Sequence, residues 1–118
     1  MAITLNTLTP GTFGFCANGY SADASGCEEL VAAPGAGKYI VLIFAMVNVG
    51  ANLTVTIGSG EDSGAVEAAV LGPISMLAGA TLLWDFRNGG IVLPANKSLT
   101  VDTSGAGAVT CFVQGRVI

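Results

Sequence analysis

The stretch KYIVLIFAMVNV, residues 38–49, decides the fold of this chain. Most of its residues are β-branched, aromatic or long aliphatic, and no polar side chain stands between Ile40 and Val47. The run lies between Gly37 and Gly50 and is too short for a membrane-spanning helix, which needs about 20 residues. It predicts a strand buried on both faces, although periodicity alone also fits a buried helix. We expect this apolar run to reach a subunit interface.

Two further segments show the alternation of strands that have one face in the core. In NLTVTI, residues 52–57, the leucine, valine and isoleucine share one face and the two threonines share the other. In SLTVDT, residues 98–103, Leu99 and Val101 alternate in the same way with polar residues. Both segments predict strands with one wet face, and residues 108–118 predict the closing strand.

Turn-forming residues divide the rest of the chain into short segments. Residues 66–76 carry Gly72-Pro73 in the middle, which predicts an edge strand, a bulge or two short strands, because proline has no N–H to donate. Short strands are also expected at residues 81–86 and 91–93. About seven to nine short strands, with no sustained helical period, predict an all-β sandwich or barrel in a single domain.

The chain divides by composition at residue 26. Residues 1–26 mix small polar residues with the single aromatics Phe13, Phe15 and Tyr20, and they predict an extended N-terminal arm with one irregular strand, FGFCANGY. Residues 27–118 predict the β-sandwich body. The three aromatics pack either on the body or on a partner, and the sequence leaves both readings open.

The composition points to contact with another chain. Hydrophobic residues make up 52% of the 118 residues and charged residues only 10%, against a usual charged share of about 25%. An apolar surplus of this kind is typical of obligate oligomers. The net charge is −4 and the four basic residues are scattered, so neither nucleic acid nor a membrane surface is an expected partner.

Residues that carry catalytic or metal chemistry are scarce. The chain has no histidine, which excludes histidine-dependent triads and His-containing zinc sites. The pairs Glu28-Glu29 and Glu61-Asp62 are sequence neighbours, which point to opposite faces of a strand and make poor acid/base pairs. The three cysteines lack CxxC spacing, and the first residues lack the features of a signal peptide, so we expect reduced, buried thiols. We therefore expect no enzyme, no metal and no cofactor.

The segment around the single tryptophan has three readings. On a strand, Trp84 points to one face and Asp85 to the other. Trp84 then belongs to the core, to a subunit interface or to a ligand site such as a sugar platform. Asp85 and Arg87 are candidates for an ion pair between subunits, which would help to set the register in a chain with so few charges.

From residue 38 onward, the order of segments resembles a group of small tailed-phage head proteins, the capsid cement or decoration proteins. The resemblance lies mainly in turn and core positions of LGPISMLAGATLLWDF (71–86), GGIVLPANKSLTVDTSGAGAV (89–109) and CFVQGRVI (111–118). It implies a jelly-roll-like β-sandwich and a non-enzymatic homotrimer that binds the major capsid protein on the outside of the head. It also implies a virion protein made in the host cytoplasm.

The N-terminal arm does not align with that group, and we expect it to contact the capsid or an adjacent subunit. The first alternative is a trimeric fibre-tip or host-receptor module that binds glycans, with Trp84, Tyr20 and the acidic loop as contacts. An enzyme and a cellular trimeric signalling-type sandwich are weaker alternatives.

Overall fold

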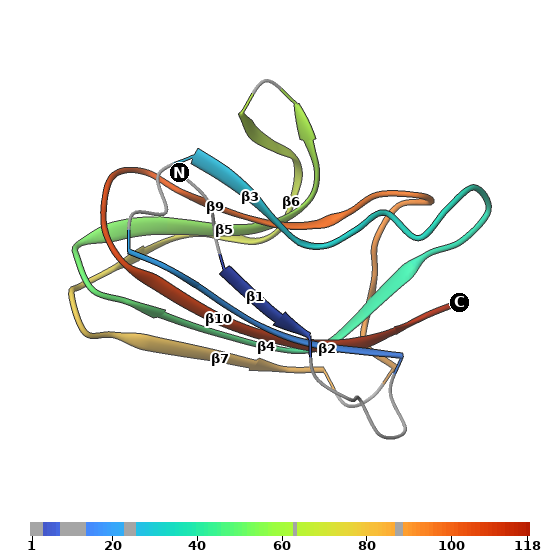
Figure 1. Cartoon of the computed structure of the whole chain (residues 1–118), viewed down its shortest axis with the longest axis horizontal. Coiled ribbons are helices and arrows are strands. Elements are labelled where there is room, and N and C mark those ends of the chain that lie inside the picture. The colour runs from blue at the N-terminus through green and yellow to red at the C-terminus, as the bar shows by residue number, and fades with distance from the viewer. Residues whose placement is uncertain (1–3, 8–13, 23–25, 63, 87–88) are drawn as a thin grey trace.

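The computed structural model describes residues 4–7, 14–22, 26–62, 64–86 and 89–118 (Figure 1). Strands dominate these residues, which contain no helix, and therefore none that could span a membrane. The strands are β1 Thr4–Thr7, β2 Phe15–Ser21, β3 Gly26–Val31, β4 Ile40–Val49, β5 Leu53–Asp62, β6 Ala65–Met76, β7 Thr81–Asp85, β8 Ile91–Val92, β9 Leu99–Thr103 and β10 Val109–Val117.

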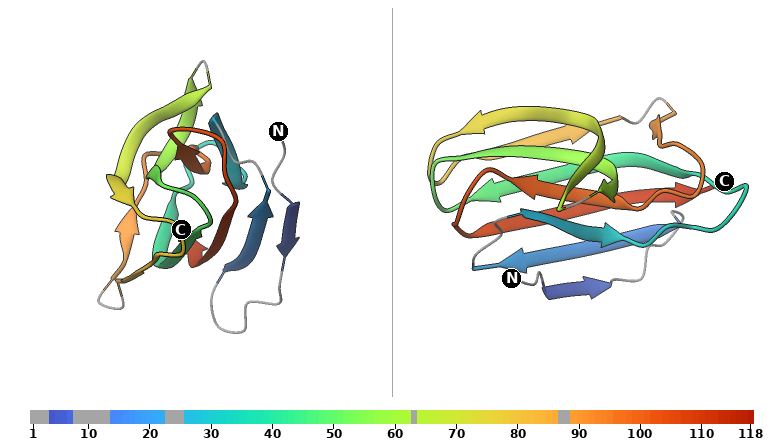
Figure 2. Two further views of the ribbon diagram at one scale, coloured as in Figure 1. Left: turned by 90° about the vertical axis from the view of Figure 1, so that its left-hand side faces the viewer. Right: turned by 90° about the horizontal axis from the view of Figure 1, so that it is seen from above.

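Two antiparallel sheets pack face to face (Figure 2). Sheet A has the order β1-β2-β10-β4-β7, with β8 also pairing with β4, and sheet B has the order β3-β9-β5-β6. The pairs are nested along the chain: β5 pairs with β6, β4 with β7 and β8, β3 with β9, and β2 with β10. Eight strands paired in this order make a jelly roll, to which β1 adds an edge strand. The predicted all-β, jelly-roll-like sandwich is confirmed.

The core lies between the sheets and is built from the alternating strands. The predicted inward residues of β5 and β9 are buried, as are three residues of β10 that share a face. These eight residues are Leu53, Val55, Ile57, Leu99, Val101, Val109, Cys111 and Val113. Thr100 points outward yet is buried, because the β5–β6 hairpin covers it. Its hydroxyl donates a hydrogen bond to the carbonyl oxygen of Gly60 at 3.1 Å.

Strand β4 holds the centre of sheet A, but only its first part is buried on both faces. Residues 40–43 are all buried, and the backbone of Gly90 lies against the outward side chain of Val41. From Phe44 onward, burial alternates: Phe44 and Met46 are partly exposed. The prediction of burial on both faces is therefore wrong for this second half, because no described segment covers its outer side.

The proline-bearing segment is an edge strand, as one of its three predicted readings states. β6 closes one side of sheet B and pairs only with β5, with register shifts between Val55 and Gly58. The missing N–H of Pro73 therefore falls in a strand that has a neighbour on one side only.

The described part of the N-terminal segment, predicted as an extended arm with one irregular strand, forms the strands β1 and β2. β2 lies between β1 and β10 and pairs with β10 over seven residues, so it belongs to sheet A. Phe15 packs against the core. Its ring occupies the space that a side chain at residue 115 would need, and it fits there because residue 115 is a glycine. β1 is the outermost strand, with Leu5 40% exposed.

Candidate interaction surfaces

The outer side of sheet A carries an apolar surface. Phe112 of β10 pairs with Met46 of β4, which pairs in turn with Leu83 of β7, so these three side chains form a row. Phe44 lies in the next outward position of β4, and Tyr20 of β2 lies in the neighbouring row. We call Tyr20, Phe44, Met46, Leu83 and Phe112 the apolar face.

Aromatic packing orders the middle of the apolar face. The rings of Phe44 and Phe112 meet edge-on, with centroids 5.8 Å apart and planes inclined by 70°. Leu83 and Tyr20, on either side, are 61% and 51% exposed. Each Å² of such apolar surface removed from water contributes about 25 cal/mol, so a partner that covers this face gains binding free energy from it.

Most of the polar groups that border the apolar face are uncharged; Asp85, which pairs with Phe44, is an exception. Asn48 is held by its amide, which donates hydrogen bonds to the hydroxyl of Thr81 at 2.8 Å and to the carbonyl of Ala80 at 3.2 Å. In the described strands of sheet A, only Asp85 and Arg116 carry charged side chains. The low charge of the chain is thus concentrated away from this side.

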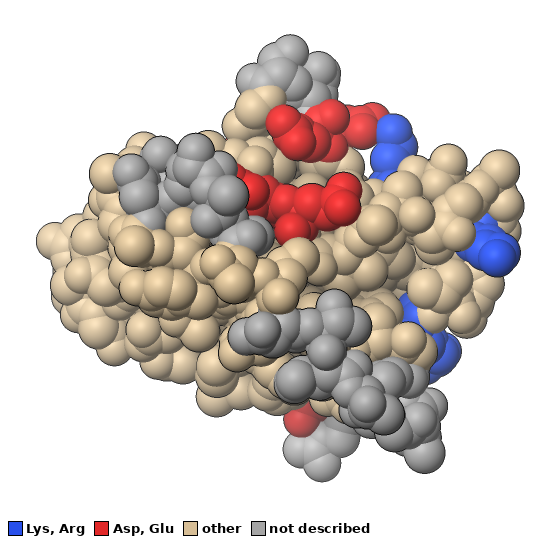
Figure 3. Space-filling view, in the orientation of Figure 1, with Lys and Arg blue, Asp and Glu red and all other residues tan. Residues whose placement is uncertain are grey.

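Sheet B carries most of the charge. Five of the described carboxylate side chains come from its strands and form the acidic face, which comprises Glu28, Glu29, Glu61, Glu67 and Asp102. In Figure 3 most of the red atoms gather in the upper part of the molecule, where Figure 1 places β3, β9 and the β5–β6 hairpin. Lys97 forms an ion pair with Glu67 at 2.8 Å.

The carboxylates of the acidic face affect the pKa of a neighbouring thiol, that of Cys27. Burial raises the pKa of Cys27, and the nearby carboxylates Asp102, Glu61 and Glu28 raise it further, while a hydrogen bond with Thr100 works in the opposite direction. Within the described residues, no three Cys, Asp or Glu side chains are grouped so as to hold a metal ion.

The three cysteines are free. Cys16 and Cys111 are buried, as predicted, and Cys27 is half-buried. Burial raises the pKa of Cys111 from 9.0 to about 12, so this inward thiol of β10 stays protonated at neutral pH.

The predicted site residues do not form one cluster. Tyr20 lies on the apolar face, and Asp85 is exposed beside Phe44. Phe15 and Trp84 point inward and pack partly exposed against the core. Phe13 and Arg87 lie outside the described residues, so the Asp85–Arg87 pair stays a prediction. Because Tyr20 and Trp84 are on opposite sides of sheet A, they do not form a joint platform for a sugar.

Trp84 belongs to a second apolar surface. This surface lies along the side of the sandwich where β6 and β7 are the edge strands of their sheets (Figure 2). Leu71 and Ile74 of β6 pair with buried residues of β5, while Leu82 and Trp84 of β7 pair with buried residues of β4. All four point toward the core but are only partly buried. We call these four residues the open edge.

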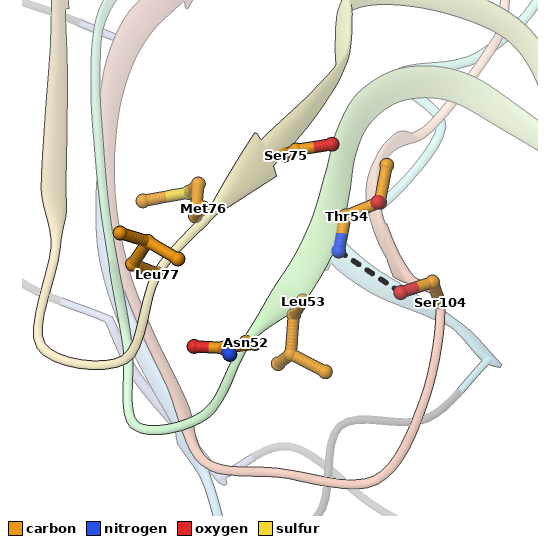
Figure 4. Close-up of a pocket in the computed structure, with 7 residues that line it drawn as sticks. All are labelled: Asn52, Leu53, Thr54, Ser75, Met76, Leu77 and Ser104. Atoms are coloured by element: carbon orange, nitrogen blue, oxygen red, sulfur yellow. Dashed lines mark hydrogen bonds between the residues drawn. The ribbon is translucent and has the colours of Figure 1, made fainter.

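A small pocket of about 250 Å³ lies where β5 begins and β6 ends (Figure 4). Its lining residues are uncharged: Asn52, Leu53, Thr54, Ser75, Met76, Leu77 and Ser104. In Figure 4, Met76 and Leu77 lie on one side and the hydroxyls of Thr54, Ser75 and Ser104 on the other. The Ser104 hydroxyl accepts a hydrogen bond from the backbone N–H of Thr54 at 2.9 Å, which fixes the β9–β10 turn against β5.

Sequence comparison assigns no family: no family model matches the chain, and no curated protein matches it. Among solved structures, an RmlC-like cupin protein from Desulfovibrio desulfuricans is similar over 96% of this chain and 82% of its own, with 11% identity and a TM-score of 0.35. The strand order described above is what identifies the jelly roll in this chain.

The main residues of the apolar face were not among the predicted site residues. Phe44 and Met46 lie inside the stretch predicted to be buried on both faces, and Phe112 and Leu83 lie in two other strands. The expectation that the run 38–49 reaches a subunit interface singled out none of these residues, and it stays a prediction. Only the register of β4, β7 and β10 brings the four residues together.

Proposed function

We propose that this protein is a structural component of a tailed-phage head: a homotrimer that binds the major capsid protein on the outer surface and stabilises the shell. The observation that carries the proposal is the apolar face, a sheet surface with two packed phenylalanines and an exposed leucine. A monomer would leave this surface in water, whereas a subunit contact covers it.

The separation of charge supports the same role. The acidic face lies on sheet B and the apolar face on sheet A, so an assembly that uses sheet A keeps the five carboxylates of the acidic face hydrated. The residues present also suit a structural role better than a catalytic one, because the chain contains no histidine. The resemblance of residues 38–118 to cement proteins is the reason for proposing the major capsid protein as the partner.

In this proposal the protein acts mechanically. One trimer contacts several capsid subunits at a local three-fold position, so contacts that are individually weak act together. Linked binding of this kind strengthens attachment by about 10²–10⁴ without any new contact. The jelly roll supplies a rigid body, and the shell then resists the pressure of packaged DNA.

The proposal is tested by two measurements on the purified chain. Light scattering should give the mass of three chains at micromolar concentration, and the protein should co-sediment with tailed-phage heads that lack their decoration. A clean monomer that leaves the heads unbound would contradict the proposal.

The pocket favours a second candidate function, a host-receptor module that binds a neutral glycan. The hydroxyls of the pocket and the Asn52 amide can hydrogen-bond to sugar hydroxyls. Leu77, which is 72% exposed, can pack against the C–H face of a sugar ring. The Asn52 side-chain oxygen already accepts a hydrogen bond from the N–H of Ala78 at 2.9 Å, which fixes the orientation of the amide. A glycan array separates the candidates: this one requires a signal that Ser75→Trp abolishes, and an array without signal excludes it.

A further inference from the structure

We propose that the subunits contact one another head to tail, with the open edge of one copy on the apolar face of the next. This inference rests on the homotrimer of the proposed function and adds which surfaces meet. The occupant of the apolar face is thus a second copy of this chain, which presents Leu71, Ile74, Leu82 and Trp84.

The two surfaces are distinct and both are apolar. The apolar face consists of outward side chains of sheet A, and its centre, Phe112, lies on β10, two strands from the β7 edge. The open edge consists of inward side chains that the core leaves partly exposed. Tryptophan is enriched among the residues that dominate binding at interfaces, and Trp84 belongs to the open edge.

A symmetric contact of two apolar faces would cover only one of these surfaces. In a two-fold arrangement the same patch meets itself, so the open edge of both copies would stay in water. In a head-to-tail arrangement each copy contributes one surface to each neighbour, and a closed ring covers both surfaces in every copy. The amount of apolar surface removed from water therefore favours the ring.

Charge and backbone chemistry agree with this choice. The stretch Leu71–Met76 of β6 carries no charged side chain, so it can be covered without desolvating a carboxylate. If sheet B of another copy covered the apolar face, the carboxylates of its acidic face would be desolvated. This cost disfavours such a contact. Pro73 removes a donor from β6, so the contact is made by side chains and not by adding a strand to β6.

The single tryptophan makes the arrangement measurable. Trp84 points inward and Phe112 points outward, so the substitution Phe112→Asp does not alter the surroundings of Trp84 within one chain. In the head-to-tail ring, however, loss of the contact uncovers Trp84 of the neighbouring copy. We expect Phe112→Asp to give monomers, with acrylamide quenching of the Trp84 emission that is severalfold stronger than in the wild-type oligomer. Equal quenching in a monomeric Phe112→Asp, or a variant that stays oligomeric, overturns the inference.

A mixing experiment gives an independent answer. Leu71→Asp should also be monomeric, and an equimolar mixture with Phe112→Asp should form a one-to-one complex in native mass spectrometry, because one intact face meets one intact edge. A folded Leu71→Asp that keeps the wild-type mass overturns the head-to-tail contact but leaves the homotrimer standing. If Leu71→Asp does not fold, the quenching experiment decides. A wild-type monomer contradicts both the inference and the proposed function.

Discussion

The rings of Phe44 and Phe112 meet edge-on at 5.8 Å across β4 and β10, on the side of sheet A that faces away from the core. Aromatic pairs in this geometry are stabilised by about 0.5–1.5 kcal/mol beyond the area they bury. Here the pair is only partly buried, which makes it the centre of a surface that a partner can cover.

The substitution Leu83→Asp should convert the oligomer to monomers without unfolding the chain. Leu83 is 61% exposed, so a charge there changes the stability of a single chain by about 0.5 kcal/mol or less, while it places a carboxylate in the subunit contact. Light scattering measures the mass, and circular dichroism checks the fold. Thr54→Asp is the matched control, because Thr54 is an outward residue of sheet B. An oligomer that survives Leu83→Asp would contradict the role of the apolar face.

Deletion of residues 1–12 should abolish binding to phage heads and leave a folded body. The deletion removes β1, which pairs only with β2, whereas β2 keeps its seven pairs with β10. Thermal unfolding reports the fold, and co-sedimentation with heads reports binding. Undiminished binding by the shortened chain would refute the assignment of a capsid contact to the arm.

The substitution Gly115→Ala should destabilise the protein strongly. A methyl group there would meet the carbonyl oxygen of Val41 and the ring of Phe15, so β2, β4 and β10 would have to move apart. We expect a loss of about 1–3 kcal/mol in the free energy of unfolding, measured in urea. Gly105→Ala is the control, since the nearest atom to its methyl group belongs to Leu53 at 3.9 Å. Equal stability of the two variants would argue against the tight packing of β2 on the body.

The stability of the fold should fall at high pH because of Cys111. Burial raises the pKa of its thiol from 9.0 to about 12, so the folded state holds the proton more tightly than the unfolded state. The stabilisation is complete below pH 9 and is lost as the pH rises toward 12, at about 1 kcal/mol per pH unit. Urea unfolding of wild type and Cys111→Ala should show a smaller decline in the variant. Parallel declines would exclude this thiol as the cause.

The sequence predicted the fold through local alternation. Leu53, Val55, Leu99 and Val101 are buried as their period of two requires, and the nested order of the strands agrees with the predicted jelly-roll-like sandwich. The alternation of Trp84 and Asp85 was also predictable. The sequence did not predict which of these two side chains points toward the core, because that depends on the pairing of β7 with β4.

The apolar face was not predictable as a site, for a related reason. Residues 40–47 read as one uniform apolar run, yet the backbone of Gly90 covers Val41, whereas no segment that the structure describes covers the partly exposed Phe44. What distinguishes the two positions is a segment about fifty residues further along the chain, which local patterns do not contain. The partners of Phe44 and Met46 likewise come from β7 and β10.

Cryo-microscopy of tailed-phage heads assembled with and without this protein tests the central claim most directly. We predict a three-lobed density at local three-fold positions on the outer surface, present only when the protein is added, with sheet A at the contacts between lobes. Identical maps of the two samples would contradict the claim.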